Sequence, residues 1–167
     1  MVAIAGALWA SPAHADPPSF ETDPTIGDFG AVTLNGVAQL TTATVSPFII
    51  SDDSGALAGW NVTLTVPQFA NGTGSDCTTD ATATIPATSV AMNAAVVAPA
   101  DGLTDMTGVS SAPFTDFTTP RKIIVATVGN GDGRYAVTPA LLRFEIPAYA
   151  QPGTYCTEAT IAITSGP

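Results

Sequence analysis

Residues 51–66, SDDSGALAGWNVTLTV, hold the pattern that decides the fold. From Trp60 to Val66 apolar residues alternate with asparagine and threonine, which is the period of a strand with one buried and one wetted face. Trp60 has the parity of the apolar set, so we expect it in the core, with its indole N–H bonded to a backbone acceptor. The alternative, a tryptophan that binds a ligand such as a sugar ring, stays open.

Outward from this stretch, short alternating segments are separated by glycine, proline, asparagine and aspartate, the pattern of antiparallel all-β proteins. We expect a single domain with an immunoglobulin-like β-sandwich. The loop 52–58 contains a glycine suited to a tight connection, so 48–51 and 59–66 are predicted to pair as a hairpin. The window 89–100 could also form a short helix. The predicted strands are 37–45, 48–51, 59–66, 81–85, 89–97, 122–128, 135–138, 141–146 and 154–164.

The first residues have the organisation of a secretory signal. An apolar run from Val2 to Ala10 is followed by a proline and by Ala13-His14-Ala15, a small-x-small cleavage pattern. We therefore expect residues 1–15 to be a signal peptide, 16–30 a proline-rich extended leader, and 31–167 the β domain. No later apolar run approaches the roughly 20 residues that span a bilayer, so we expect no anchor and no membrane insertion of the mature form.

The charge balance excludes some partners. Fourteen acidic residues stand against four lysines and arginines, which gives a formal net charge of −10. Nucleic-acid binding needs clustered basic side chains, and anionic membrane surfaces need them as well. We therefore expect neither as a partner.

Two cysteines, Cys77 and Cys156, in an exported chain indicate one disulfide, with two free thiols as the alternative. Their separation gives no C-x-x-C redox spacing, so a structural bridge is expected. With only two cysteines and no histidine after residue 15, a zinc site would have to be built mostly from carboxylates, which structural zinc rarely accepts. We therefore predict no cofactor and no metal. Calcium remains an alternative at Asp52 with Asp53, Asp76 with Asp80, or Asn130 with Asp132, although turn chemistry explains these residue types better.

Two stretches carry a resemblance to a known family. The first is 51–66, and the second is 141–167, LLRFEIPAYAQPGTYCTEATIAITSGP, preceded by GNGDGRY. Together they resemble the WxL domain of bacterial surface proteins. Trp60-Asn61-Val62 matches the first Trp-x-Leu motif as Trp-x-Val, whereas Ile161-Ala162-Ile163 replaces the second. The resemblance implies a secreted all-β module that attaches non-covalently to the peptidoglycan of Gram-positive bacteria, or to other surface proteins, with Trp60 the one residue transferable to binding.

We therefore expect an exported, non-enzymatic protein of the cell surface or cell wall. The chain has no histidine after residue 15, so the usual nucleophile and base pairs are missing. A carboxylate pair of the glycosidase kind stays as a remote alternative. A second alternative is a structural subunit that assembles through exposed strand edges, because the strands are threonine-rich and carry few charges.

Overall fold

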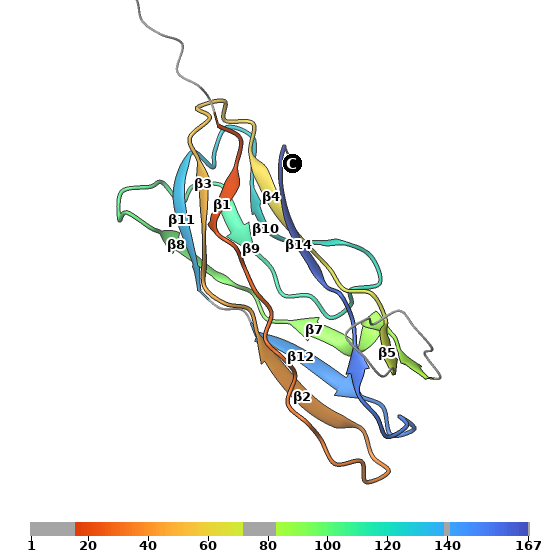
Figure 1. Cartoon of the computed structure of the whole chain (residues 1–167). Helices are drawn as coiled ribbons and strands as arrows, with labels where there is room; N and C mark the ends of the chain where they lie inside the picture. Colours follow the sequence, from red (N-terminus) through yellow and green to blue (C-terminus); the bar gives the residue numbers. More distant parts are fainter. Residues whose placement is uncertain (1–15, 72–82, 139–140, 167) are drawn as a thin grey trace, which may run out of the picture.

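The computed structural model describes residues 16–71, 83–138 and 141–166. This part of the chain is all-β, as predicted, with antiparallel sheets and one short 3-10 helix, η1 (Ala87–Ser89). Figure 1 shows an elongated molecule with its strands running along the long axis. The predicted signal peptide, residues 1–15, lies outside the described residues.

Two four-stranded sheets face each other in one half of the molecule. The first has the order β1 (Ser19–Thr22), β3 (Phe48–Asp52), β11 (Gly133–Thr138), β8 (Val96–Pro99). The second has the order β14 (Thr160–Ser165), β4 (Trp60–Thr65), β10 (Arg121–Ala126), β9 (Val109–Ser111). All of the pairings are antiparallel.

Two three-stranded sheets continue these layers in the other half (Figure 1). One has the order β2 (Gln39–Thr44), β12 (Leu141–Ile146), β7 (Val90–Met92), and the other β13 (Tyr155–Cys156), β5 (Phe69–Asn71), β6 (Thr84–Ile85). Along the chain β2 leads directly into β3, β4 into β5, and β13 into β14. The sheets therefore form two long layers whose strands are interrupted near the middle.

Aromatic contacts join the two layers in both halves. The Trp60 ring on β4 lies 5.4 Å from the Tyr135 ring on β11, edge to face. In the other half the Phe69 ring on β5 stacks on Phe144 of β12 at 4.2 Å. Such pairs add roughly 0.5–1.5 kcal/mol beyond the area they bury. One hydrophobic core therefore runs the length of the molecule.

The predicted hairpin between 48–51 and 59–66 is wrong. β3 pairs with β1 and β11, whereas β4 pairs with β10 and β14, so the two strands lie in opposite layers. Both strands carry fully buried side chains, Ile50 and Trp60 among them, that meet in the core. The loop between them is longer than the tight turns that hold a hairpin in one sheet, and it carries the chain across the core.

Two predicted strands are divided in the structure. Residues 89–97 split into β7 and β8, which pair with β12 and β11 in different sheets. Residues 154–164 split into β13 and β14, which pair with β5 and β4. The strands β5 and β9 were not predicted at all, and they are only three residues each. Of the predicted strand 81–85, residues 81 and 82 lie outside the described residues.

The segment 16–30, predicted as a leader without strands, is extended but is paired with the domain. β1 pairs with β3, Ile26 forms an isolated bridge with Val45, and the Gly27 N–H donates to the Thr44 carbonyl at 3.0 Å. Phe20 packs edge-on against Phe48 at 5.6 Å. These backbone pairings and the Phe20–Phe48 contact hold the segment against one flank of the first layer.

Candidate functional site

Trp60 lies in the core and not at a surface site. Its side chain has 0% exposure, and its Nε1–H donates to the Gly131 carbonyl at 2.8 Å. The neighbouring Tyr135 hydroxyl donates toward the carbonyls of Asp105 and Asp132, and burial raises the pKa of Tyr135 to about 12. The prediction that Trp60 lies in the core is thereby confirmed. A side chain with no exposed area cannot stack on a ligand at the surface.

Two glycines make this placement of Trp60 possible. Gly131 has φ +96°, and a Cβ there would lie 2.7 Å from the indole nitrogen. Gly59 has φ +74°, and its Cβ would lie 2.5 Å from the Ala126 carbonyl oxygen. Any other residue would be strained at these angles and would collide with its neighbours.

The acidic loops at the Trp60 end of the core form ordinary turns. Asp52 accepts the Ser54 N–H at 3.1 Å, and Asp53 accepts the Ser51 hydroxyl at 3.2 Å. Backbone N–H groups of Leu103 and Thr104 hold the pKa of Asp101 low, at about 2. Within 16–71, 83–138 and 141–166 no cluster of three or more potential ligands could hold a metal ion. Of the calcium alternatives, Asp76 with Asp80 lies outside the described residues.

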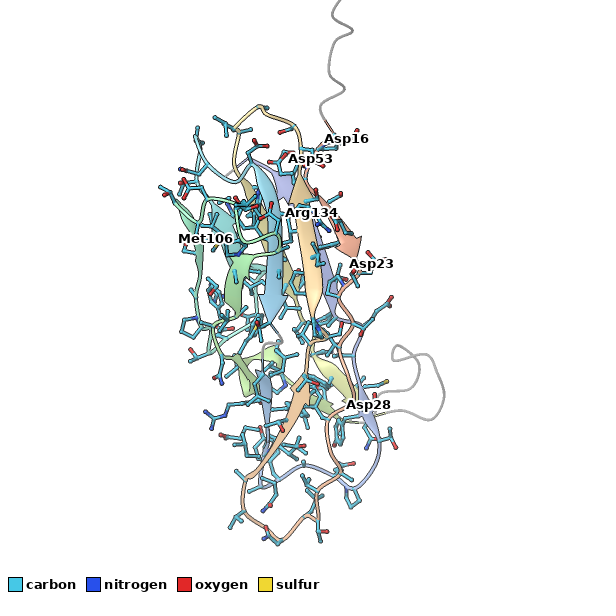
Figure 2. All side chains as sticks on the ribbon, turned by 90° about the vertical axis from the view of Figure 1, so that its left-hand side faces the viewer. Asp16, Asp23, Asp28, Asp53, Met106 and Arg134 are labelled. Atoms are coloured by element: carbon cyan, nitrogen blue, oxygen red, sulfur yellow. The ribbon has the colours of Figure 1, made fainter. Side chains whose placement is uncertain are left out.

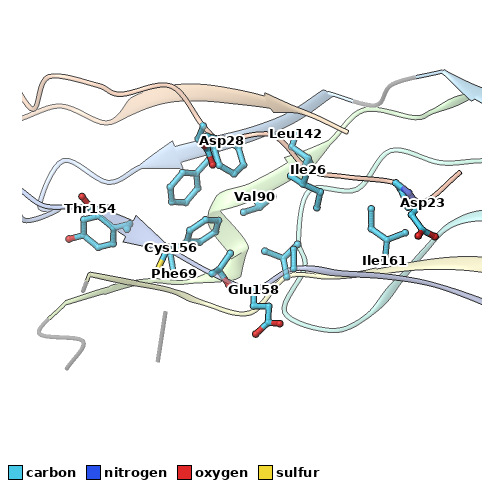
Figure 3. A pocket seen from close by; sticks show the side chains of 18 of the residues that line it. Asp23, Ile26, Asp28, Phe69, Val90, Leu142, Thr154, Cys156, Glu158 and Ile161 are labelled. Atoms are coloured by element: carbon cyan, nitrogen blue, oxygen red, sulfur yellow. The ribbon is translucent and has the colours of Figure 1, made fainter. Parts of the chain in front are cut away.

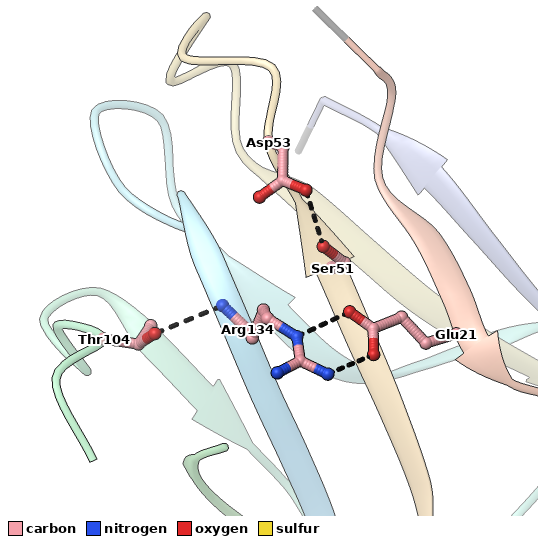
Figure 4. A network of polar contacts seen from close by, with 5 residues as sticks. All are labelled: Glu21, Ser51, Asp53, Thr104 and Arg134. Atoms are coloured by element: carbon pink, nitrogen blue, oxygen red, sulfur yellow. Dashed lines mark hydrogen bonds and ion pairs between the residues drawn. The ribbon is translucent and has the colours of Figure 1, made fainter. Parts of the chain in front are cut away.

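An ion pair fastens β1 to this end of the first sheet. Arg134 Nε donates to Glu21 Oε1 at 2.6 Å, and a second guanidinium nitrogen contacts the other carboxylate oxygen (Figure 4). The bidentate contact lowers the pKa of Glu21, chiefly through its hydrogen bonds to Arg134. Figure 2 shows Arg134 and Asp53 toward the end of the molecule opposite Asp28. The Arg134–Glu21 pair therefore joins β1 to β11 and stabilises the fold.

A hollow lies between the first and last segments of the described chain, and we call it the edge groove. It has a volume of ≈ 820 Å³. Residues 20–29 form one wall and residues 154–161 form the other (Figure 3). Its floor consists of core side chains from both layers: Val66, Phe69, Val90, Leu142 and Phe144. Ligand sites commonly have an apolar floor, and in this groove polar and acidic side chains surround that floor.

A second hollow of ≈ 630 Å³ lies on the other side of Phe29, lined by residues 29–34 and 151–155 among others. Phe29 and Tyr155 line both hollows. Phe29 is held by its ring contacts with Phe144 at 5.2 Å and Phe69 at 6.0 Å. The two hollows share Phe29, Phe144, Thr154 and Tyr155 in their linings, so they adjoin along the same flank.

The charge around the edge groove has one sign. Asp23 and Asp28 line it from the N-terminal wall and Glu158 from the C-terminal wall (Figure 3), and its described lining contains no lysine or arginine. All three acids are exposed. The groove therefore combines an apolar floor with an acidic rim.

Cys156 also lines the edge groove, on β13, and it is half-buried. Cys77 lies outside the described residues, so the bridge between them stays a prediction. On β14, Ile161 and Ile163 pack against the core while Thr160 and Thr164 are exposed.

The edge groove could not be predicted from local patterns, because its walls come from segments far apart in the sequence. One signal was present in the segment taken as a leader, namely Phe20, Ile26 and Phe29 among prolines and acids. All three are half-buried and all three line the groove. Large apolar residues are unusual in a solvated linker, and they indicate a segment that packs on the domain.

The comparisons with known proteins give no relative: no family model matches the chain, and no curated protein matches it. Within the described residues, no helix has the length and hydrophobicity needed to cross a membrane. The function is therefore argued from the site.

Proposed function

We propose that this protein is an exported, non-enzymatic binding module of the bacterial cell surface. In this proposal the edge groove holds the protein to a component of the cell wall or to a wall-bound protein. The two facing layers correspond to an immunoglobulin-like β-sandwich, stapled by the predicted bridge between Cys77 and Cys156. The protein would act in the wall of a Gram-positive bacterium, reached through the predicted signal peptide.

The observation that carries this proposal is the edge groove itself. A hollow of ≈ 820 Å³ that reaches core side chains is large enough to receive several side chains or sugar units of a ligand. Its apolar floor offers binding energy of roughly 25 cal/mol for each Å² of apolar surface covered. In this proposal the carboxylates of Asp23, Asp28 and Glu158, the charged side chains of the described lining, serve recognition of the ligand.

Several residues that resemble the WxL domain make hydrogen bonds that stabilise the fold. The Gly166 N–H donates to the Gly59 carbonyl at 2.8 Å, and the Asn61 amide donates to the Gly166 carbonyl at 2.8 Å. Trp60 in turn bonds to Gly131. These hydrogen bonds hold the two quoted stretches together at one end of the core, whereas Val66 and residues 154–161 of the same stretches line the edge groove.

A second candidate function is self-assembly through strand edges. β14 is an edge strand of six residues without a charged residue or proline, and such edges are poorly protected against pairing with another chain. The net charge of −10 opposes association of identical copies at low ionic strength. Sedimentation velocity over a wide concentration range tests this candidate, and a monomer throughout would exclude it.

Co-sedimentation of the purified secreted protein with cell-wall preparations tests the main proposal. We expect binding to walls that retain their proteins, and loss of it in Ala159→Trp, which places a large ring in the edge groove. Ala162→Trp is the matched control, because Ala162 is exposed on β14 outside the groove lining. No binding to walls with or without proteins, or equal binding of both variants, would refute the proposal.

A further inference from the structure

β14 presents a free backbone edge beside the edge groove. In register with β4, Ser165 lies opposite Trp60, and the Gly166 N–H continues the ladder to the Gly59 carbonyl. Bonded and non-bonded pairs alternate in an antiparallel ladder, so Thr160, Ala162 and Thr164 exchange hydrogen bonds with β4. The N–H and C=O groups of Ile161 and Ile163 therefore point away from β4, toward an edge where no described strand pairs.

The two flanks of the molecule differ in this respect. On the β8 and β9 flank the edges of the two layers meet, and the Ser111 hydroxyl donates to the Ala95 carbonyl. On the opposite flank, Phe20 of β1 and Ile161 of β14 line the edge groove, which opens between residues 20–29 and 154–161 (Figure 3). The open flank thus has the two features that an added strand requires, an unpaired backbone edge and a hollow for alternate side chains.

The acidic rim of the groove indicates which kind of ligand it would bind. Asp23, Asp28 and Glu158 line the groove without a basic neighbour in its described lining. A second copy of this chain is a poor source of cations, since it has four lysines and arginines in all. Two of these, Arg134 and Arg121, already pair with Glu21 and Asp116. The complementary ligand is a polypeptide that carries lysine or arginine.

A glycan fits the groove less well than a polypeptide. Sugar rings stack on exposed aromatic faces, whereas the aromatic side chains that line the groove are buried or half-buried. Among the described aromatic side chains only Tyr149 is exposed. Tyr149 lies outside the lining of both hollows. The groove offers half-buried apolar contacts and a backbone edge, which match an extended polypeptide.

We propose that the edge groove binds one extended segment of a partner protein, which adds to β14 as a further strand. Alternate apolar side chains of that segment enter the groove, and flanking lysine or arginine residues meet Asp23, Asp28 and Glu158. This inference rests on the proposed function, and it narrows the ligand from any wall component to a basic, strand-forming segment of a wall-bound protein.

The first test is selection from a random displayed peptide library on the immobilised secreted protein. We expect enriched peptides to alternate apolar residues and to carry lysine or arginine. Ile161→Pro should bind them about tenfold more weakly than Ile161→Ala, because both lose the side chain but only proline lacks the edge N–H. Equal affinities of these two variants, or enrichment of acidic peptides, would overturn the inference. Ala159→Trp offers an independent block if Ile161→Pro does not fold.

Amide hydrogen exchange, measured by NMR with an enriched peptide, reports the added strand directly. The amides of Ile161 and Ile163 should exchange rapidly in the free protein and slow by at least about tenfold in the complex. Those of Ala162 and Thr164, already bonded to β4, serve as internal controls. Unchanged exchange at Ile161 and Ile163 in the complex would refute strand addition.

Wall co-sedimentation separates this inference from the proposed function. Equal binding to walls stripped of protein and to untreated walls would keep the wall-binding function and overturn the polypeptide ligand. Binding of the selected peptides at β14 without any binding to walls would support the ligand class and refute the surface function.

Discussion

At the scale of residues, Trp60 is the centre of a set of contacts that the local sequence explains. Its N–H bonds to the Gly131 carbonyl, and its ring meets Tyr135. Gly59 and Gly131 give the backbone the angles and the space that the indole needs. The tryptophan and its glycines therefore form one structural unit, in which each residue depends on the others.

Trp60→Phe should lower the free energy of unfolding by about 2–3 kcal/mol. The change removes part of a fully buried ring and leaves the Gly131 carbonyl without its donor. Urea unfolding followed by circular dichroism measures the loss. Tyr149→Phe is the control, since Tyr149 is 79% exposed and its change should cost less than about 0.5 kcal/mol. A Trp60→Phe variant as stable as the parent would contradict the core role.

Gly131→Ala should also destabilise the protein, and by more than a typical glycine change at the surface. The added Cβ would lie 2.7 Å from the indole nitrogen, at a φ of +96°. We expect a loss of at least about 2 kcal/mol and a change in Trp60 fluorescence. Gly36→Ala is the matched control, because Gly36 has φ +82° with nothing near its Cβ position. Equal losses in the two variants would mean that the Trp60 contact carries no cost.

Asp101 should contribute to the acid sensitivity of the fold. Its pKa is lowered from 3.8 to about 2, first by the Leu103 N–H and then by Thr104. A carboxyl whose pKa is lower in the folded state stabilises the fold above its unfolded pKa, and that contribution disappears as the pH falls from about 4 to about 2. Asp101→Asn should therefore lose less stability over this interval than the parent. Parallel pH profiles for the two proteins would contradict this assignment.

At the scale of elements, local patterns predicted strands well and their partners poorly. The alternation in β4 correctly places Trp60, Val62 and Leu64 in the core, but Asn61, on the face predicted to be wetted, is buried as well. The hairpin prediction failed because a loop rich in glycine and aspartate does not reveal whether the chain returns to the same sheet. The breaks between β7 and β8, and between β13 and β14, were not visible because residues 93–95 and 157–159 contain no glycine or proline that would mark them.

β1 should contribute to stability although it lies in a proline-rich segment. Phe20→Ala removes the contact with Phe48 and should cost about 1–2 kcal/mol, measured by thermal or urea unfolding. Thr22→Ala on the same strand is the control, because Thr22 is exposed. If Phe20→Ala costs no more than Thr22→Ala, β1 does not pack on the domain in solution.

The predicted bridge between Cys77 and Cys156 is tested by chemistry. Alkylation of the denatured, unreduced protein should add no label, and reduction should lower the free energy of unfolding by about 4 kcal/mol. The physical reason is the long loop that the bridge would close, which restricts the unfolded chain. Incorporation of two labels without reduction would refute the bridge.

At the scale of the whole molecule, the candidate site depends on the packing of distant segments. The edge groove needs residues 20–29, residues 154–161 and a floor from both layers. The all-β class followed from composition and period, and the place of Trp60 followed from parity. No local pattern states that Phe20 and Ile161 face the same hollow, because that depends on which flank of the layers stays open.

The measurement that tests the central claim most directly is an NMR titration of the isotope-labelled secreted protein with solubilised cell-wall extract. The account predicts that chemical shifts change first around the edge groove, at Ile26, Ala159 and Ile161, and remain unchanged around Trp60 and on β9. Changes confined to the acidic loops or to the β8 and β9 flank, or no changes with any wall extract, would contradict it.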